Sequence, residues 1–142
     1  MTGLGDIFKA SFRRPLGALS GGLLLALYMI AIFADLIAPA ATNEQDLDRT
    51  YHPPTKIIWG EGGLRVQAYD LTDPSTAGYE AVPGKSYALK VLGRGFEYRL
   101  LGIFKTNRHL LVCDDPEGAF YLLGSDSTGR DVFSRLVFGS RV

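Results

Sequence analysis

Charged side chains are missing from one long stretch near the start of this 142-residue sequence. Its 15 basic and 15 acidic side chains all lie outside residues 15–34, which read PLGALSGGLLLALYMIAIFA. A helix of this length is about 30 Å long and matches the hydrocarbon core of a bilayer, so a membrane-spanning helix is predicted over residues 15–36. The alternative is a secretory signal peptide with a cleavage motif at residues 38–40. It is disfavoured because signal cores run about 7 to 15 residues and because Pro39 interrupts the motif.

Features that indicate catalysis or nucleic-acid binding are also lacking. A formal net charge of zero argues against a nucleic-acid partner, because phosphate binding needs a basic surplus. The lone Cys113 cannot form an internal disulfide, and His52 and His109 are too far apart in sequence to suggest a metal site. No Gly-x-Ser-x-Gly motif indicates a hydrolase. We therefore expect no catalytic, cofactor-binding or metal-binding residues and no enzyme activity, with both histidines hydrogen-bonded structural residues and Cys113 a small buried side chain.

The charges that flank the apolar stretch predict its orientation. Residues 1–14 have a net charge of +2 and residues 35–142 a net charge of −2. Because positive flanks stay inside, the amino terminus is expected in the cytoplasm and the chain after Asp35 outside. Apolar residues recur at helical spacing within residues 1–14, which suits an amphipathic segment lying on the bilayer, although a frayed tail fits the residues equally well.

Small residues near the start of the apolar stretch form a GxxxG pattern, made by Gly17 and Gly21. Such a face lets two helices pack closely in lipid. The two glycines are therefore candidates for packing against a partner helix, on a pattern that is common in membrane segments.

Beyond the helix the sequence predicts an extracytoplasmic region with a small, mostly antiparallel β structure. Residues 37–63 are rich in proline and polar residues and are expected to form a loop. Residues 64–123 hold short runs of strand formers at a spacing of roughly ten residues, typical of a small sheet or open barrel. Because about 60 residues is marginal for an independent core, we expect this insert to lean on the membrane part or on a partner. Expected strands cover residues 64–69, 86–92, 96–104, 109–113 and 119–123, with turns at 73–74, 83–84, 93–95, 106–107 and 115–118.

The last stretch, residues 124–142, changes to a helical pattern. Its apolar side chains share one helical face and its charges recur at the i, i+4 spacing of helical salt bridges. Because the pattern is still running at Val142, we expect an amphipathic helix that leads toward a second membrane helix missing from the sequence. The candidate pairs are Asp126–Arg130 and Asp131–Arg135, the candidate N-cap is Ser127 or Thr128, and the apolar face comprises Val132, Phe133, Leu136 and Val137.

The sequence LLGSDSTGRDVFSRLVFGSRV, residues 122–142, closely resembles a signature of ABC-transporter permeases of the dipeptide/oligopeptide/nickel class. In the C-type subunit of that family the signature stands just before the second membrane helix. Ser125 occupies a position where threonine is usual and keeps the hydroxyl. An Ile-Ala-Pro at residues 37–39 and the pair Pro53-Pro54 also fit the family. The matching signature residues are Leu123, Gly124, Asp126, Gly129, Arg130, Asp131, Ser134, Arg135, Gly139 and Arg141.

The resemblance implies a transport subunit. Such permeases form a heterodimeric pore with a homologous permease subunit, and two cytoplasmic ATPase subunits, which hold ATP and magnesium, drive it. An extracytoplasmic solute-binding protein delivers peptides, or nickel in some members. The signature residues are expected to act in structure and assembly, and the long insert at residues 64–123 resembles the extra region of a subset of members.

Two overall interpretations follow. The first is a membrane protein of α plus small β class, the amino-terminal fragment of a permease that is multi-pass in the cell (inner or plasma) membrane, because the sequence holds one membrane helix and no ATPase-coupling motif. The second is a single-span membrane-anchored protein that displays a small extracytoplasmic β domain for binding or scaffolding.

Overall fold

The computed structural model describes residues 14–141. Apart from Arg14, the amphipathic segment expected at residues 1–14 lies outside this range. The first described helix, α2 (Pro15–Ile32), begins with a proline in its first turn, where the missing N–H costs no hydrogen bond. Within residues 14–141, α2 is the one helix long and apolar enough to cross a membrane by length and composition.

The predicted helix over residues 15–36 is interrupted at Phe33. This residue leaves helical geometry, while its N–H still donates to the Met29 carbonyl at 2.9 Å and closes α2. A single further turn, α3 (Ala34–Ile37), then redirects the chain. Ala34 at its start and Ala38 just after it are fully buried, whereas no residue of α2 is buried among the described residues. The chain therefore changes from an unpacked apolar helix to packed structure at Phe33.

The predicted small antiparallel sheet is confirmed. Its four strands lie in the order in which they occur along the chain, with antiparallel pairing throughout. The loop expected at residues 37–63 contains a 3-10 turn, η1 (Leu47–Arg49), and the first strand. The strands are β1 (Ile57–Gly60), β2 (Gly63–Asp73), β3 (Gly78–Leu100) and β4 (Phe104–Cys113).

β3 is one long bent strand where the sequence predicts two strands and two turns. The expected turn at residues 83–84 lies in a register shift where β3 gains residues relative to β2. At the expected turn 93–95, Gly93 and Arg94 stay paired with β4, and a second shift follows between Arg94 and Tyr98. Proline and glycine mark such bulges as readily as they mark turns. The expected turn at residues 106–107 is wrong, because both residues lie inside β4. The first part of β3 thus pairs with β2 and the last part with β4.

The core of the sheet is small and is completed by a segment that is not a strand. Val66 and Leu89 pack against Phe120, with half-buried Leu122 at the edge of the cluster. The strand predicted at residues 119–123 is wrong: this segment belongs to no strand of the sheet and bends at residues 122–123. Phe120 and Leu122 of this segment nevertheless pack on the core of the sheet.

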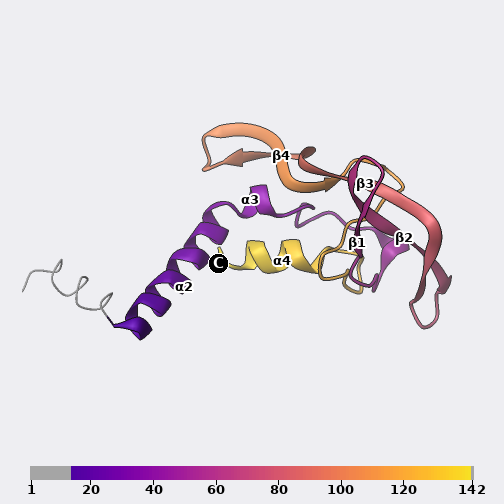
Figure 1. The fold of residues 1–142 in the computed structure, drawn as a ribbon, viewed down its shortest axis with the longest axis horizontal. Coiled ribbons are helices and arrows are strands. Elements are labelled where there is room, and N and C mark those ends of the chain that lie inside the picture. Colours follow the sequence, from indigo (N-terminus) through magenta and orange to yellow (C-terminus); the bar gives the residue numbers. More distant parts are fainter. Residues whose placement is uncertain (1–13, 142) are drawn as a thin grey trace, which may run out of the picture.

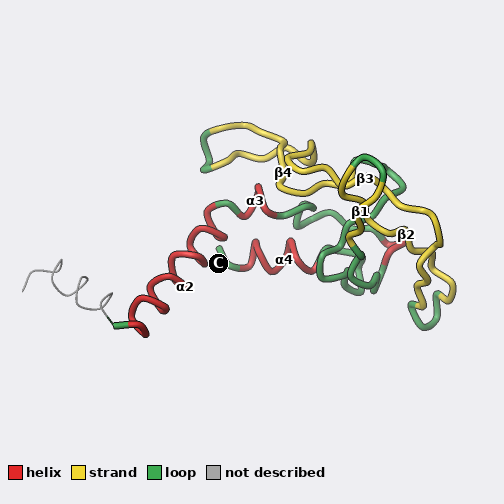
Figure 2. Tube along the Cα trace, in the orientation of Figure 1, coloured by secondary structure: helices red, strands yellow, loops and turns green. Residues whose placement is uncertain are grey.

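The elements form an elongated molecule with α2 at one end and the sheet at the other (Figure 1). The last helix, α4 (Val132–Gly139), runs back from the sheet toward α2 and contacts both α2 and α3. Figure 2 shows that long loops join these helices to the sheet. The end of the described chain therefore lies beside the end of α2.

Candidate functional site

Two loops far apart in sequence bind each other along their backbones. We call residues 38–56, between α3 and β1, the exit segment, and residues 122–141 the signature segment. His52 and Ser125 form the centre of the contact: the His52 N–H donates to Ser125 Oγ at 2.8 Å, and the Ser125 N–H donates to the His52 carbonyl at 3.0 Å. The Tyr51 N–H donates to the Asp126 carbonyl at 3.1 Å. The signature segment is therefore docked on the exit segment.

The hydroxyl of Ser125 makes two hydrogen bonds to the exit segment. Besides accepting from His52, it donates to the Arg49 carbonyl, and Ser125 is buried. A buried hydroxyl needs such partners, because an unpaired polar group in the interior is costly. The serine hydroxyl therefore links the Arg49 carbonyl and the His52 N–H of the exit segment.

Gly124 and Gly129 bring the two backbones into direct contact. Both have positive φ, +84° and +70°, a region that side chains disfavour. A Cβ on Gly124 would lie 2.6 Å from the His52 carbonyl oxygen, and one on Gly129 would lie 1.7 Å from that of Asp46. Any side chain at either position would therefore displace the exit segment.

Asp126 organises the turn that carries these glycines. Its Oδ1 accepts from the Thr128 N–H at 2.8 Å, the Thr128 hydroxyl at 2.7 Å and the Arg130 N–H at 3.1 Å. Its Oδ2 pairs with the Arg135 guanidinium. These bonds, those of Thr128 foremost, hold the pKa of Asp126 well below its usual range. Asp126 is thus ionised at neutral pH, at the centre of the turn.

Asp131, not Ser127 or Thr128, is the N-cap of α4. Its Oδ2 accepts from the Ser134 N–H at 2.8 Å and from the Ser134 hydroxyl at 2.6 Å, which shifts the helix start to Val132. Asp131 is 3% exposed and its Oδ1 has no hydrogen-bond partner among the described residues. Burial raises the pKa of this carboxyl.

The predicted salt bridges at i, i+4 are both wrong. The stretch from Asp126 to Asp131 is a turn, so the helical spacing does not apply there. Arg135 pairs with Asp126 instead of Asp131. Arg130 contacts Asp126 through its backbone alone: its N–H donates to Asp126 Oδ1, and its carbonyl accepts from the Asp126 N–H. With the Gln45 amide turned so that its oxygen faces the guanidinium, Arg130 donates to the exit segment at 2.8 and 3.2 Å.

Ser134 and Arg141 connect α4 to the chain around α2. The buried Ser134 hydroxyl accepts from the Ala40 N–H at 3.2 Å. Arg141 donates to the Ala31 carbonyl at 2.7 Å and the Ile32 carbonyl at 3.2 Å. It also forms a 2.6 Å ion pair with Asp35. A cation at the carboxyl end of a helix satisfies free carbonyls and complements the helix dipole.

The remaining candidate glycines lie outside this contact. A Cβ on Gly139 would meet nothing within 4 Å. Gly17 and Gly21 lie on α2, which buries no residue within the described part of the chain. The structure thus brings together most signature residues and leaves these three glycines apart.

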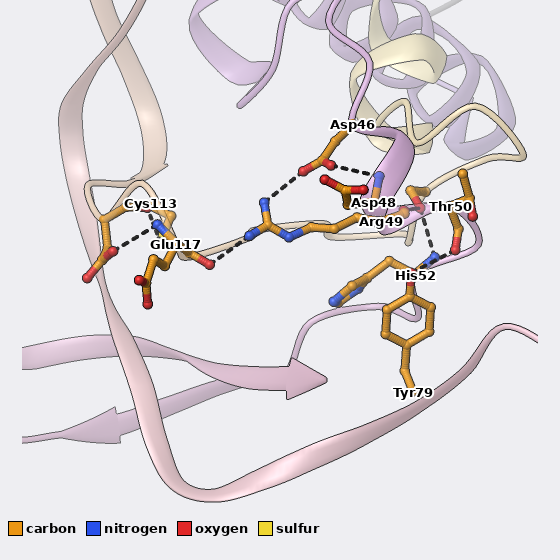
Figure 3. A network of polar contacts seen from close by, with 10 residues as sticks. Asp46, Asp48, Arg49, Thr50, His52, Tyr79, Cys113 and Glu117 are labelled. Carbon is orange, nitrogen blue, oxygen red and sulfur yellow. Dashed lines mark hydrogen bonds and ion pairs between the residues drawn. The ribbon is translucent and has the colours of Figure 1, made fainter. Parts of the chain in front are cut away.

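A polar and aromatic cluster beneath the exit segment is not evident from the sequence (Figure 3). Arg49 forms a 2.7 Å ion pair with Asp46 and donates to the Glu117 carbonyl at 2.8 Å. The Tyr79 hydroxyl donates to the Thr50 carbonyl at 2.8 Å. A sequence signal for this cluster is weak, since its members come from three separate segments.

His52 is a structural residue, as the sequence predicts. Its ring lies among three tyrosines, Tyr69, Tyr79 and Tyr121, at centroid distances of 5.4, 4.7 and 5.1 Å, and its Nδ1 lies 2.7 Å from the Pro53 carbonyl. Burial lowers the pKa of His52 and raises the pKa of Tyr121 to about 12. Both rings are therefore uncharged at neutral pH.

His109 is also a structural residue, fully buried between two chain segments. Its Nδ1 lies 2.9 Å from the Ala38 carbonyl and its Nε2 lies 2.9 Å from that of Phe96. Cys113 is half-buried, and burial raises the pKa of its thiol. Within residues 14–141 no group of three or more metal-binding side chains is close enough to hold a metal ion.

The fold and this contact define a class of architecture: a candidate membrane-spanning helix followed by a docked turn and a small sheet. Residues 4–54 match a protein family described as the N-terminal TM domain of oligopeptide transport permease C. The resemblance predicted from the sequence is confirmed over these residues, which are similar to the start of a transport permease subunit. The searches of curated proteins and of solved structures found no match.

Proposed function

We propose that the chain is the amino-terminal portion of the C-type permease subunit of an ATP-driven ABC importer. In this role α2 spans the membrane with its amino terminus in the cytoplasm, and the sheet lies outside. The transported solute is a dipeptide or oligopeptide, or a related solute such as nickel. The family match over residues 4–54, which covers α2 and most of the exit segment, carries this proposal.

The docked signature segment supports an assembly role for its residues. Arg141 holds the end of α4 against the end of α2, at the point where the family's second membrane helix follows. The signature segment would therefore set the spacing between the first two membrane helices at the outer surface. Rigid docking of this kind suits a pore whose two halves must move as units while ATP is hydrolysed elsewhere.

Each proposed partner has a separate role in transport. A homologous permease subunit completes the pore, two cytoplasmic ATPase subunits hold ATP and magnesium, and an extracytoplasmic binding protein delivers the solute. The chain itself has no covalent step to perform in this scheme. Its contribution is placement of a membrane helix and of the outer surface beside it.

Affinity purification from native membranes tests the proposal. The gene product is tagged at its own locus and purified in mild detergent, and uptake of a labelled dipeptide is measured in intact cells. We expect two ATPase subunits and a second permease to copurify, and uptake to fall when the gene is deleted. As a matched pair, Gly129→Ala should reduce copurification because it displaces the exit segment, whereas Gly139→Ala should not.

The alternative of a single-span anchor with a displayed β domain gives the opposite result. The tagged protein would then extract from membranes without ATPase subunits, and the deletion strain would take up peptides normally. Either finding, with the protein present at normal levels, would contradict the transport role.

A further inference from the structure

The turn between β3 and β4 is apolar and exposed. We call residues 100–104, LLGIF, the hairpin tip. Leu101, Ile103 and Phe104 are 56%, 73% and 63% exposed. A contiguous apolar patch at the end of a projecting hairpin is unfavourable in water and marks a surface that contacts something else.

The backbone of the hairpin tip makes its sequence more unusual. The Ile103 N–H donates to the Leu100 carbonyl at 3.1 Å, and the two residues between them, Leu101 and Gly102, have φ of +53° and +73°. Turns of this type favour asparagine or glycine at both central positions, because a branched side chain is strained at positive φ. Leu101 is therefore strained and exposed at once, and neither property helps the hairpin fold in water. Strain of this kind points to function.

Two cations flank the apolar turn. Arg99 and Lys105 are direct cross-strand partners, both exposed, and neither forms an ion pair with another described residue. Like charges placed opposite each other destabilise an isolated hairpin. Next to an anionic layer the same arrangement is favourable, since each long side chain can reach a phosphate while its stem stays among apolar groups.

The hairpin is anchored beside the membrane end of the chain. His109 of β4 lies against the Ala38 carbonyl just after α3, and α3 contacts both β3 and β4. Figure 1 shows the hairpin (orange) running back from the sheet over α3, toward the side on which α2 lies. The hairpin tip is therefore near the place where the chain leaves the apolar helix.

We propose that the hairpin tip inserts into the outer leaflet of the bilayer that α2 spans, with Arg99 and Lys105 at the level of the lipid phosphates. The inference rests on the proposed membrane placement of α2. An apolar tip flanked by cations suits the bilayer interface, where apolar groups enter the acyl boundary and cations meet anionic lipid. The position of the hairpin beside the end of α2 puts the tip within reach of that interface. The sheet would then be held to the membrane at two points, α2 and the hairpin tip, which fixes its tilt relative to the surface.

Tryptophan fluorescence in brominated lipid tests the insertion. The full chain with Trp59→Phe has no tryptophan, and one is returned by Ile103→Trp at the hairpin tip. The chain is reconstituted into vesicles of phosphatidylcholine and phosphatidylglycerol with or without bromine on the acyl chains. We expect bromine to reduce the fluorescence of the Ile103→Trp chain by about two-fold, since interfacial anchors reach the acyl boundary. Adding Arg99→Glu and Lys105→Glu should abolish that reduction.

Two reference positions separate this inference from the membrane placement of α2. Leu24→Trp within α2 should be quenched by bromine, and Leu71→Trp on the exposed end of β2 should not. Quenching at Leu24 without quenching at Ile103 overturns the insertion alone. Absence of quenching at both overturns the placement of α2 as well. An Ile103→Trp chain shielded from bromine and from aqueous iodide would show that a protein partner, not lipid, covers the hairpin tip.

Discussion

At the scale of single residues, the signature segment depends on positions where a side chain cannot fit. Gly124 and Gly129 touch carbonyl oxygens of the exit segment directly, whereas Gly139 faces open space. The absence of a side chain is therefore required at Gly124 and Gly129 but not at Gly139. Substitution by alanine separates the two cases.

Gly129→Ala should lower the free energy of unfolding by at least about 2 kcal/mol, because it combines positive φ with a backbone clash. Gly139→Ala should leave stability unchanged or raise it slightly, since alanine favours a helix. Thermal unfolding of the full chain in detergent micelles, followed by circular dichroism, measures both. Equal midpoints for the two variants would show that the exit segment yields easily and that the contact is loose.

The titration of Asp131 is expected to make the stability of the protein depend on pH. Its folded-state pKa is raised above the ordinary value of 3.8 by burial. Its contribution to stability is therefore complete below pH 3.8 and is lost as pH rises through the folded pKa. Asp126 has the opposite sign, since its lowered pKa contributes stability that is lost as pH falls. The neighbouring Tyr121, with a pKa of about 12, stays neutral throughout.

Asp131→Asn removes this single titration and keeps an oxygen for the Ser134 cap. We expect the variant to gain stability relative to the wild type as pH rises from 3.8 toward neutrality, with the two proteins closest at the acid end. Denaturant unfolding at a series of pH values gives the difference in the free energy of unfolding between the two proteins. The contribution of Asp126 is common to both and drops out of this difference. Parallel curves over this range would mean that Asp131 titrates normally in the folded protein.

At the scale of elements, the end of α2 and the end of α4 share one arginine. Arg141 donates to the last carbonyls of α2 and pairs with Asp35. Because the contact is partly exposed, its removal should cost only about 0.5 to 1 kcal/mol. Its effect should be local, limited to the last turn of α2 and to the contact with α4.

We expect Arg141→Ala to speed amide hydrogen exchange at Phe33, whose N–H closes α2, and to leave exchange in the sheet unchanged. Exchange is followed by mass spectrometry in detergent micelles. Arg94→Ala, on exposed β3, is the matched loss of one arginine and should change nothing at Phe33. Faster exchange throughout the Arg141→Ala protein would indicate a global role for this side chain instead.

The elements also show what sequence patterns can and cannot resolve. Composition alone predicts α2, because a long uncharged apolar run is typical of a single long helix. The regularly spaced runs of strand formers predict an antiparallel sheet. The prediction of turns fails at residues 83–84 and 93–95, where the chain continues within β3 and Pro83, Gly84 and Gly95 lie in its register shifts. The prediction of a strand also fails at residues 119–123, where Phe120 and Leu122 pack on the sheet while the Tyr121 backbone bonds to Thr55. The same local residues suit a turn or a bulge, and a paired strand or an unpaired apolar segment. Pairing with distant parts of the chain decides which of these forms.

The candidate site shows the same division. The residues of the signature are recognisable in the sequence, but their partners are not, because each contact joins positions about 70 to 80 residues apart. The contacts are Asp46 with Gly129, Arg49 with Glu117 and His52 with Ser125. Spacing at i, i+4 assigned Arg135 to Asp131, whereas the turn geometry gives it to Asp126. Because residues 126–131 form a turn and not a helix, the i, i+4 spacing does not predict which charges pair there.

At the scale of the whole molecule, the sheet is an insertion whose two ends meet. The Thr55 N–H donates to the Tyr121 carbonyl at 2.8 Å, and the Tyr121 N–H donates to the Thr55 hydroxyl at 3.0 Å. The bonds between His52, Ser125 and Asp126 lie outside this closure and do not pass through the sheet. The sheet and the docked helices therefore meet at this closure and also where α3 packs on β3 and β4, with His109 against the Ala38 carbonyl. The bonds that dock the signature segment on the exit segment are separate from these contacts.

Replacing residues 57–118 by a short Gly-Ser linker should consequently preserve the docking of the signature segment, because a loop with adjacent ends closes at little entropic cost. Cysteines in place of Asp35 and Arg141, whose charged atoms lie 2.6 Å apart, report the docking through a short bis-maleimide in native membranes. The full chain for comparison carries Cys113→Ser. We expect cross-linking in both chains, and its loss in both when Gly129→Ala is added. Cross-linking in the full chain but not in the shortened one would show that the sheet holds the signature segment in place.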